Sequence, residues 1–493
     1  MALPQLHFTD CAVSNGLFPV RRELPDSDAV PIALECSDLI DGTPFILGDD
    51  GAYDLDLNRF FRECPGVGVR SPNSVRAYAR DILTWMRFLH ERRGDKSLWR
   101  ADRQDLIAFH RARRLTSGPG QISASTWNRS VTALERFYGW AWEEGLVAAT
   151  PFARGEFAPS PLMPTRHARR RSRSFREAAA RRHDMRFIDM ARFILFRDVG
   201  LRAHFPNGSV DAAWRGRTGE RDALFAELLT ATGMRLEEAS SLLPADLPRH
   251  DDLLLGDARS CAVHLPPAIC KGGKGREIRV PRRLLRRIDD YMVIERANAV
   301  VRWRARRSWE GVRDPIGVVA WERRAAVING ADLRPLRRRL DVMRPDERAR
   351  LIVAGSDGVP IEPAALWLAD NGQPMRPAAW QASFLRADAR CRLHGLDLHV
   401  TPHMLRHTFA VHMLSLLIRA QIGAVLAPHD HHGAAYRRII GDPLQKLQRL
   451  LGHSSITSTY IYLDCLEESR ALVDAAAARW ADDLDAVVPG SAL

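Results

Sequence analysis

The feature that most constrains the fold is a break in pattern at residues 153–186. Three prolines (Pro159, Pro161 and Pro164) precede nine arginines between Arg166 and Arg186, and only Glu177 and Asp184 oppose them. Such a segment has too little apolar surface to bury, so we expect a flexible linker. At 493 residues the chain is also too long for one ordinary core. The sequence therefore predicts at least two domains, one on either side of this linker.

Residues 57–152 show the periodicity of a small all-helical domain. Ser71 can cap a helix that has Pro72 in its first position, and Asp102 opens a second helix. A third helix is expected to begin near Ser123 and to end at Gly145. Apolar residues recur at helical spacing in these stretches, which leaves several arginines on the outer faces.

Residues 187–485 predict a larger, mostly helical domain. Helices are expected over 222–230, closed by Gly233, over 283–307, and from about 373 to an acidic final helix at 467–485. Short strands are expected at 253–255, 261–271 and 276–280, with a strand and turn at 367–372. The polar, irregular stretch 308–362 and the stretch 414–441 are interpreted as insertions, residues 1–56 as an extension of unknown role, and 486–493 as a tail. The predicted fold class is mainly α with a small antiparallel β-sheet.

Charge indicates a polyanionic partner. The net charge is +12 and the pI is near 9.8. Binding of phosphates by Lys and Arg releases condensed counterions and drives association, so a nucleic acid is a candidate partner. Ordinary solvated charge is the competing interpretation. The residues that we assign to phosphate contacts are Arg76, Arg80 and Arg129 of the helical domain, and Arg169, Arg170, Arg171 and Arg173 of the linker.

Other compositional features argue against several classes. The seven cysteines stand singly without C-x-x-C spacing, which disfavours a disulfide framework or a zinc site. No run of eighteen apolar residues and no secretory signal is present, so we expect a cytoplasmic protein with no membrane partner. The run His429-Asp430-His431-His432 could hold a metal, but adjacent histidines seldom all face one ion, so a solvated loop is favoured and no metal or other cofactor is expected.

Residues suited to phosphodiester chemistry follow one another along the second domain. Arg235 lies in Thr232-Gly233-Met234-Arg235, and His403 and Arg406 lie in His403-Met404-Leu405-Arg406-His407. Phosphoryl transfer spreads charge over the nonbridging oxygens, and an arginine fork binds two of them at once. His403 and Arg406 share a helix face at i and i+3, and Glu238 could hold the Arg235 guanidinium.

A tyrosine phenol suits a reversible phosphate ester because it leaves more readily than an alkyl hydroxyl. Two tyrosines follow His453, and the family resemblance given below favours Tyr462, nine residues after His453, as the nucleophile, with Tyr460 as the alternative. Lys271 is the expected general acid for the departing oxygen, and Lys274 is the runner-up. His403 could accept the tyrosine proton, and His453 in Gly452-His453-Ser454-Ser455 could donate a hydrogen bond to a nonbridging oxygen.

The ordered set Arg235, Lys271, His403, Arg406, His453 and Tyr462 resembles the active site of the tyrosine recombinases, the phage integrase family. The resemblance is loose over 57–152, which it implies is a SAM-like core-binding domain. It is specific over about 215–475, which it implies is a catalytic domain with the DNA breaking-rejoining fold. It further implies metal-free cleavage of one strand through a 3′-phosphotyrosine, protomers that associate as dimers and tetramers on two DNA sites, and action in the bacterial nucleoid or on a mobile element.

Several alternatives remain open on the sequence alone. A type IB topoisomerase shares the catalytic set but relaxes a single duplex. A DNA-binding factor could keep the fold without the chemistry, although an inactive relative has no chemical reason to retain all six residues. A metal-dependent relaxase built on the His429 run is a distant third. The two insertions and residues 1–56 lie outside the minimal family plan, so the DNA target and any accessory proteins are left undetermined.

Overall fold

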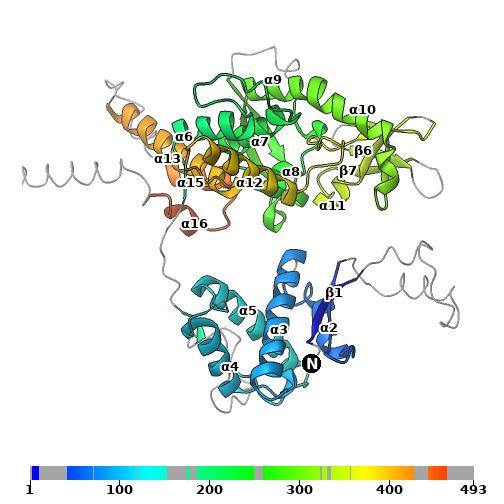
Figure 1. The fold of residues 1–493 in the computed structure, drawn as a ribbon, viewed down its shortest axis with the longest axis vertical. Helices are drawn as coiled ribbons and strands as arrows, with labels where there is room; N and C mark the ends of the chain where they lie inside the picture. The colour runs from blue at the N-terminus through cyan, green and yellow to red at the C-terminus, as the bar shows by residue number, and fades with distance from the viewer. Residues whose placement is uncertain are drawn as a thin grey trace, which may run out of the picture. The chain divides into compact units, whose positions relative to one another are not determined.

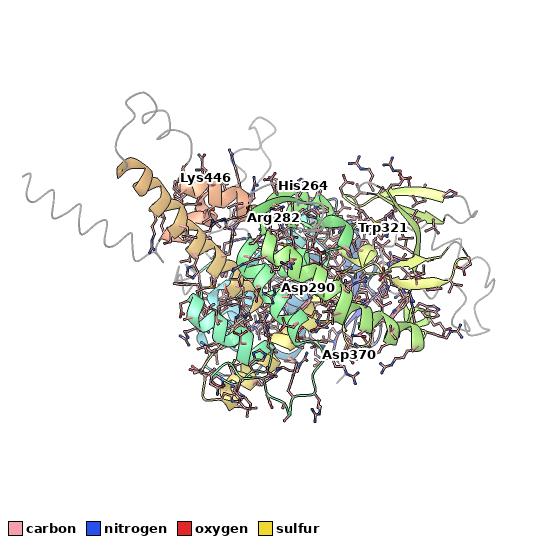
Figure 2. The ribbon with its side chains drawn as sticks, turned by 90° about the horizontal axis from the view of Figure 1, so that it is seen from above. His264, Arg282, Asp290, Trp321, Asp370 and Lys446 are labelled. Carbon is pink, nitrogen blue, oxygen red and sulfur yellow. The ribbon has the colours of Figure 1, made fainter. Side chains whose placement is uncertain are left out.

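The computed structural model describes residues 3–9, 42–69, 71–118, 120–152, 175–177, 186–248, 259–322, 325–329, 335–355, 357–426 and 442–463. The chain divides into two compact units, Met1–Arg182 and His183–Leu493. Helices make up most of both units (Figure 1), and Figure 2 shows the chain with its side chains. Among the described residues, no helix is long and apolar enough to cross a membrane.

Three helices of the first unit begin where the sequence predicted: α3 (Pro72–Arg92), α4 (Arg103–His110) and α5 (Ala124–Glu143). A further helix, α2 (Leu55–Glu63), was not predicted, and shorter turns lie at Leu98–Arg100 and Arg111–Leu115. Ser71 precedes α3, the Asp102 carboxylate caps α4, and the Ser123 hydroxyl accepts a hydrogen bond from the Thr126 amide. Apolar faces of these helices meet in one aromatic core that includes Trp85, Trp127 and Phe137.

The described parts of the predicted N-terminal extension, 3–9 and 42–56, pack on the helical unit. Strands β1 (Gln5–Phe8) and β2 (Pro44–Leu47) form an antiparallel hairpin that packs on α2 and α3. Ile46 is buried in the helical core, and the Asn58 side chain bonds both its amide (2.7 Å) and its carbonyl (3.0 Å). Each strand has only four residues, too few to show an alternating pattern in the sequence.

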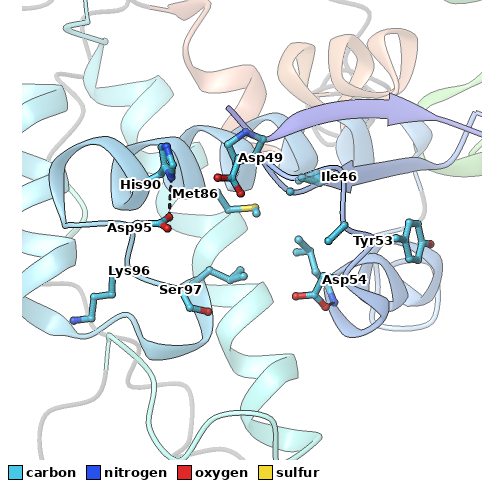
Figure 3. Close-up of a pocket in the computed structure, with 14 residues that line it drawn as sticks. Ile46, Asp49, Tyr53, Asp54, Met86, His90, Asp95, Lys96 and Ser97 are labelled. Carbon is cyan, nitrogen blue, oxygen red and sulfur yellow. Dashed lines mark hydrogen bonds and ion pairs between the residues drawn. The ribbon is translucent and has the colours of Figure 1, made fainter. Parts of the chain in front are cut away.

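A hollow of about 260 Å³ lies where this hairpin meets α3 and the loop that follows it. Figure 3 shows Asp49 and Tyr53 from the segment after β2 on one side, and Met86 and Lys96 on the other. The rim is polar, and His90 Nδ1 lies 2.7 Å from an Asp95 carboxylate oxygen. The hairpin therefore extends the surface of the helical unit and does not form a separate body.

Part of the predicted linker packs on the first unit. The Trp127 indole donates to the carbonyl of Phe175 (2.6 Å), whose ring is buried. Glu177 accepts two hydrogen bonds from Arg114 (2.9 and 2.6 Å). The expectation that all of 153–186 stays free was wrong at 175–177, because one aromatic ring among the arginines finds an apolar site. The linker arginines assigned to phosphate contacts, 169–173, lie outside the described residues.

The second unit is organised around α7 (Gly219–Thr232), most of which is buried. Phe225 of α7 stacks on Trp380 with ring centroids 3.5 Å apart, and Trp367 packs edge-on against both rings. The expected basic helix over 283–307 is confirmed as a continuous run of helical turns. The helices and turns of this unit are α6 (Met190–Leu195), Phe196–Leu201, α8 (Leu236–Ser240), α9 (Arg282–Tyr291), Met292–Arg296, α10 (Ala297–Ala305), α11 (Pro345–Arg348), α12 (Pro377–Leu393), α13 (Pro402–Leu426), α15 (Pro443–Leu451) and α16 (Thr457–Tyr460).

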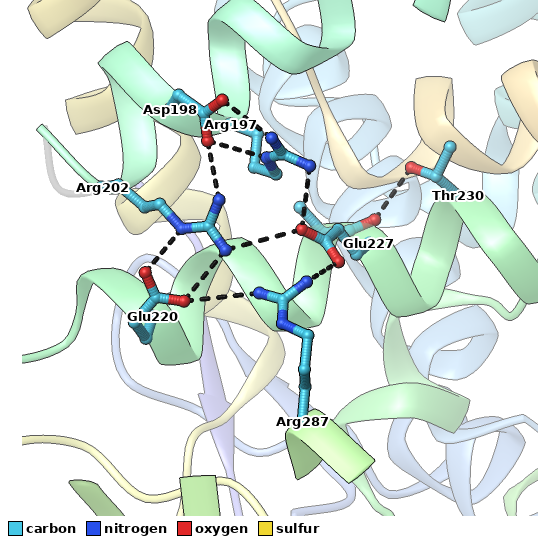
Figure 4. Close-up of polar contacts among 8 residues, drawn as sticks. Arg197, Asp198, Arg202, Glu220, Glu227, Thr230 and Arg287 are labelled. Atoms are coloured by element: carbon cyan, nitrogen blue, oxygen red, sulfur yellow. Dashed lines mark hydrogen bonds and ion pairs between the residues drawn. The ribbon is translucent and has the colours of Figure 1, made fainter. Parts of the chain in front are cut away.

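An ion-pair network joins the segment after α6 to α7 and α9. Figure 4 shows Arg202 between Asp198 and Glu220, with N to O distances of 2.7 and 2.6 Å. Arg197 and Arg287 both reach Glu227. Since these charges are only partly exposed and linked to one another, they fix the orientation of α7 more firmly than isolated surface pairs would.

The described residues of the second unit form two sheets. Strands β3 (Ser260–Leu265) and β4 (Arg276–Pro281) pair antiparallel. The strand expected over 261–271 stops at Leu265, because Pro266 and Pro267 turn the chain into short helical turns at Pro267–Ile269 and Lys271–Gly273. The strand expected at 253–255 and the helix expected at 467–485 lie outside the described residues.

The second sheet corrects the prediction for 308–362. This stretch holds most of a five-stranded sheet in the order β7 (Pro335–Arg339), β6 (Ala325–Asn329), β5 (Ile316–Glu322), β8 (Leu351–Ala354) and β9 (Pro360–Pro363). Only β5 and β8 pair parallel. The sheet has its own small core, which includes Val318, Ile328 and Met343. In both views of the second unit, this sheet and α15 lie at opposite ends (Figures 1 and 2).

Gly233 ends α7 with a left-handed backbone (φ 63°), and an added Cβ would lie 2.3 Å from the Phe409 ring on α13. We expect Gly233→Ala to lower the free energy of unfolding by roughly 3 kcal/mol, from backbone strain plus overpacking. Gly395→Ala is the matched control, since Gly395 is also left-handed but has open space around it, and it should cost about 1 kcal/mol. Denaturant unfolding of both variants measures the difference, and equal losses would contradict this packing.

Candidate active site

Arg235 stands at the turn between α7 and α8. The left-handed Gly233 reverses the chain, so Arg235 becomes the residue that precedes the first turn of α8. Its guanidinium donates to Glu238 Oε1 (2.9 Å), and its backbone amide donates to Glu238 Oε2 (2.8 Å). A quarter of the Arg235 side chain stays exposed. Glu238 therefore holds Arg235 as the sequence predicted, and the other terminal nitrogen of Arg235 donates to the Gly452 carbonyl at the end of α15 (3.4 Å).

Arg276 completes this cluster and was not predicted. From β4, it donates to both carboxylate oxygens of Glu238 (2.7 and 2.6 Å) and through Nε to the Leu450 carbonyl (2.9 Å). The sequence contained a signal, because Arg276, Ile278 and Val280 stand at every second position and so share the buried face of the strand. A buried arginine in register with core residues indicates a partner inside the fold.

Glu238 is a buried carboxylate between two guanidinium groups. Burial alone would raise its pKa, but the hydrogen bonds and charges of Arg276 and Arg235 outweigh burial and hold the pKa below its ordinary value. The carboxylate is therefore ionised at neutral pH. It offsets the charge of the arginines gathered around it.

Arg406 of α13 is 2% exposed and is held by backbone carbonyls. It donates to the carbonyl of Gly233, at the end of α7, and to that of Leu451 (2.6 Å), at the end of α15. Burial, followed by the charges of Arg235 and Arg276, lowers the pKa of Arg406 to about 9. Arg406 therefore keeps its charge at neutral pH, and it joins three segments that are far apart in the sequence.

Tyr462 lies in the buried centre of the site. It is 1% exposed, and its hydroxyl oxygen lies 3.1 Å from His407 Nδ1. Its ring is nearly parallel to that of His453, at a tilt of 12° and a centroid distance of 6.2 Å. Tyr460, by contrast, is 49% exposed. The structure thus brings Tyr462, and not Tyr460, into contact with the histidines of this site.

Helix α16, between His453 and Tyr462, is a short helix of four residues. Helix α16 ends at Tyr460, and Tyr462 lies in the turn that follows. The Ser455 hydroxyl accepts a hydrogen bond from the Thr457 amide (3.2 Å), although Ile456 is the residue that precedes the helix. The turn, and not the helix, directs the Tyr462 ring inwards.

His407 is the second residue that the sequence prediction missed. His403 was expected to receive the tyrosine proton, but His407, one helical turn further along α13, lies at the hydroxyl. The two rings meet edge to face with centroids 4.3 Å apart. Burial, followed by the charges of His403 and Arg406, lowers the pKa of His407 to about 4, so its imidazole is neutral at neutral pH.

His453 follows Gly452, which ends α15 with a left-handed backbone (φ 63°). A Cβ at Gly452 would lie 2.8 Å from Cδ of Arg276, so the turn also needs glycine for close approach. His453 Nδ1 lies 3.0 Å from the Thr459 hydroxyl. Burial and the charges of Arg406, Arg235 and Arg276 lower the pKa of His453 to about 4.

Lys271 and Lys274 lie on the exposed turn between β3 and β4. The pKa of His403 is lowered by burial, by Arg406 and Arg235, and also by the charge of Lys271. Lys271 is therefore close enough to His403 to act on its pKa through charge. The choice of Lys271 over Lys274 as the general acid stays a prediction.

The three arginines of the first unit that were predicted to contact phosphates have different surroundings. Arg80 is exposed on α3. Arg129 pairs with both carboxylate oxygens of Asp81 (3.0 and 3.1 Å), and the Arg76 guanidinium lies 5.8 Å from the Phe8 ring centroid in the hairpin. The histidine run 429–432 lies outside the described residues. Within the described ranges, no cluster of His, Cys, Asp and Glu is arranged to hold a metal ion.

Comparison with known proteins identifies the family. Residues 57–145 match the family described as phage integrase, N-terminal SAM-like domain, and residues 210–422 match the phage integrase family. The chain is 26% identical to the tyrosine recombinase XerD of Mycobacterium tuberculosis over 79% of this chain and 86% of that protein. It is 35% identical to XerD of Corynebacterium glutamicum over 21% of this chain and 26% of that protein. A crystal structure of the XerH site-specific recombinase bound to a palindromic difH substrate is 14% identical, with a TM-score of 0.45 over 95% of this chain and 93% of that one.

The chain belongs to the tyrosine recombinase family, and it is an enzyme, a site-specific recombinase. The expected family and the mainly helical fold are confirmed. The topoisomerase and non-catalytic alternatives are not favoured by these matches. Because the second family match ends at residue 422, the roles of His453 and Tyr462 rest on the geometry given above.

Glu238→Gln should destabilise the protein at neutral pH by about 3 kcal/mol, because it removes the charge that pairs with the buried Arg276 and the partly buried Arg235. The folded pKa of Glu238 lies below the ordinary 4.5, so the stability that its ionisation provides is present above pH 4.5 and is lost as pH falls through the folded pKa. The deficit of the variant should therefore shrink in acid. Glu237→Gln, at an exposed neighbour, is the control, and a deficit independent of pH would contradict the assignment.

Proposed function

We propose that the chain cuts and rejoins double-stranded DNA at specific sites through a 3′-phosphotyrosine on Tyr462, without a metal. The observation that carries this proposal is the contact between the buried Tyr462 hydroxyl and His407, beside His453. The guanidinium of Arg406 is held at the same place by carbonyls from two helix ends. A buried phenol against a neutral imidazole has a partner for its proton, and the arginines supply charge for a phosphate.

The reaction proceeds by one exchange of bonds at phosphorus. The Tyr462 oxygen forms a bond to the phosphorus as the bond from phosphorus to the 5′ oxygen breaks. The tyrosine proton passes to His407 Nδ1, and Lys271 gives a proton to the departing 5′ oxygen. Arg235 and Arg406 bind the nonbridging oxygens, and His403 and His453 complete their hydrogen bonding. Reversal with the 5′ hydroxyl of a partner duplex rejoins the strands.

The wider assembly follows from the same proposal. Residues 57–152 act as the core-binding domain, and 187–485 as the catalytic domain. The linker arginines and Arg80 contact DNA phosphates, and these contacts do not depend on the base sequence. Protomers associate as dimers and tetramers on paired sites in the bacterial nucleoid, and accessory proteins are compatible with the insertions. The relatives named tyrosine recombinase XerD support the recombinase part of this proposal.

The direct test uses the full-length protein and a pool of random-sequence duplexes in excess chelator. Protein and DNA that remain joined in denaturant are isolated, and the attached strands are sequenced. The proposal expects a common sequence attached through its 3′ end. An adduct that forms only when divalent metal is added back would contradict metal-free cleavage, and the absence of any adduct would contradict the proposed chemistry.

The choice of nucleophile is tested on the duplex selected in this way. Tyr462→Phe should abolish the denaturant-resistant adduct, because a benzene ring has no oxygen to attack phosphorus. Tyr460→Phe is the matched control, two residues away and exposed, and should leave adduct formation unchanged. Loss in the Tyr460 variant with survival in the Tyr462 variant would reverse the assignment.

The choice of general acid is tested by replacing the 5′-bridging oxygen with sulfur, since a thiolate leaves without a proton. Lys271→Ala should cleave the oxygen substrate about 10²- to 10⁴-fold more slowly and should recover most of its rate on the sulfur substrate. Lys274→Ala, from the same exposed turn, should behave as the unaltered protein on both. Rescue of the Lys274 variant alone would transfer the role to Lys274.

A further inference from the structure

The segment 308–362, called the inserted lobe below, has no role in the reaction as derived so far. It contains ten arginines and nine Asp or Glu residues, so it is close to neutral. The arginines of its β7 edge strand are paired, Arg337 with Glu322 (2.7 Å), Arg338 with Glu347 and Arg339 with Asp341. A surface whose charges are already neutralised is poorly suited to gripping phosphates. The lobe requires a different explanation.

Arg348 anchors the lobe to the segment that follows α8. This arginine, at the end of α11, is 1% exposed and donates to an Asp246 carboxylate oxygen (2.6 Å) and to the Ser241 carbonyl (3.2 Å). Asp246 is itself fixed, because its carboxylate accepts a hydrogen bond from the Leu243 amide (2.8 Å). A buried ion pair with backbone partners on both sides sets one geometry for the contact.

The same guanidinium organises a loop of the lobe. It donates to the carbonyls of Leu340 (2.7 Å) and Met343 (3.2 Å), so residues 340–343 wrap around it. Within this loop, the Asp341 carbonyl accepts a hydrogen bond from the Ala268 amide (3.2 Å). Ala268 lies in the helical turn that leads, three residues later, to Lys271.

We propose that the inserted lobe positions the Lys271 turn, with Arg348 as the positioning residue. The turn from 267 to 273 is exposed at its tip, and Ile269 and Cys270 hold its base in the hydrophobic core between β3 and β4. The hydrogen bond from Ala268 to Asp341 adds a contact from the lobe that further limits the motion of the turn. The lobe supplies that contact through the Asp341 carbonyl, and Arg348 attaches the lobe to residues 241–246. This inference rests on the proposed function of Lys271 as the general acid.

The effect should be confined to the lysine turn. Helix α8, which follows Arg235, is held independently by the bond from the Trp367 indole to the Ala239 carbonyl (3.0 Å) and by the pair of Arg276 with Glu238. The lobe lies at the end of the unit opposite α15, which leads to the tyrosine turn (Figures 1 and 2). Loss of Arg348 should therefore impair protonation of the leaving oxygen and spare the attack by Tyr462.

The test compares cleavage of oxygen and 5′-bridging sulfur substrates by the full-length Arg348→Met variant. We expect a loss of about 10²-fold on the oxygen substrate, which is the effect expected when a reacting group is displaced by about 1 Å. On the sulfur substrate the rate should return close to that of the unaltered protein. Arg344→Met is the matched control, because Arg344 precedes the same helix but is 62% exposed in its side chain and should affect neither rate.

Two results would overturn the inference: an equal loss on both substrates, which would mean that Arg348 supports the fold or Arg235, and no loss on either. If Arg348→Met does not fold, Arg348→Lys keeps the charge but cannot reach all the carbonyls, and its oxygen-to-sulfur ratio decides in the same way. Failure of the proposed function looks different, because the unaltered protein would then cleave neither substrate.

Discussion

The site depends on one buried carboxylate. The Glu238 carboxylate accepts hydrogen bonds from the guanidinium of Arg235, at the start of the same helix, and from that of Arg276 on the neighbouring strand. It also accepts a hydrogen bond from the Arg235 backbone amide, which caps the first turn of α8. With Arg406 close by, three guanidinium groups share a small volume, and without Glu238 their mutual repulsion would have no internal offset. The carboxylate therefore makes it possible to gather enough positive charge for a phosphate before any DNA arrives.

Helix ends supply the remaining compensation. Both α7 and α15 end in a left-handed glycine, and the carbonyls left unpaired there accept hydrogen bonds from Arg406 and Arg276. The C-terminal end of a helix carries partial negative charge, so these carbonyls favour the charged form of the arginines. The same glycines allow the close approach of Phe409 and of the Arg276 stem. Chain reversal, charge balance and the placement of the motifs are thus achieved by the same few residues.

Sequence reasoning predicted the features that depend on local rules. The helix starts after Asp102 and Ser123 follow from capping, and the start after Ser71 follows from Pro72 in the first turn. The set from Arg235 to Tyr462 follows from the resemblance to the tyrosine recombinases and suits phosphoryl transfer. Arg276 and His407 were missed because their roles come from tertiary contacts, with partners 38 and 55 residues away in the chain. The inserted sheet was taken for irregular chain because its strands are short and its apolar positions are diluted by paired charges. Burial of an arginine in a strand pattern is the one clue that could have been used earlier.

The central claim is that Tyr462 becomes joined to DNA. It is tested most directly by trapping the adduct formed by the unaltered protein, digesting the DNA with nuclease and the protein with protease, and locating the nucleotide remnant by fragmentation mass spectrometry. Tyr460 and Tyr462 fall on one peptide, so fragment ions that separate them are required. The account predicts a 3′-linked nucleotide on Tyr462. A remnant on Tyr460, on a serine or on any other residue would contradict it.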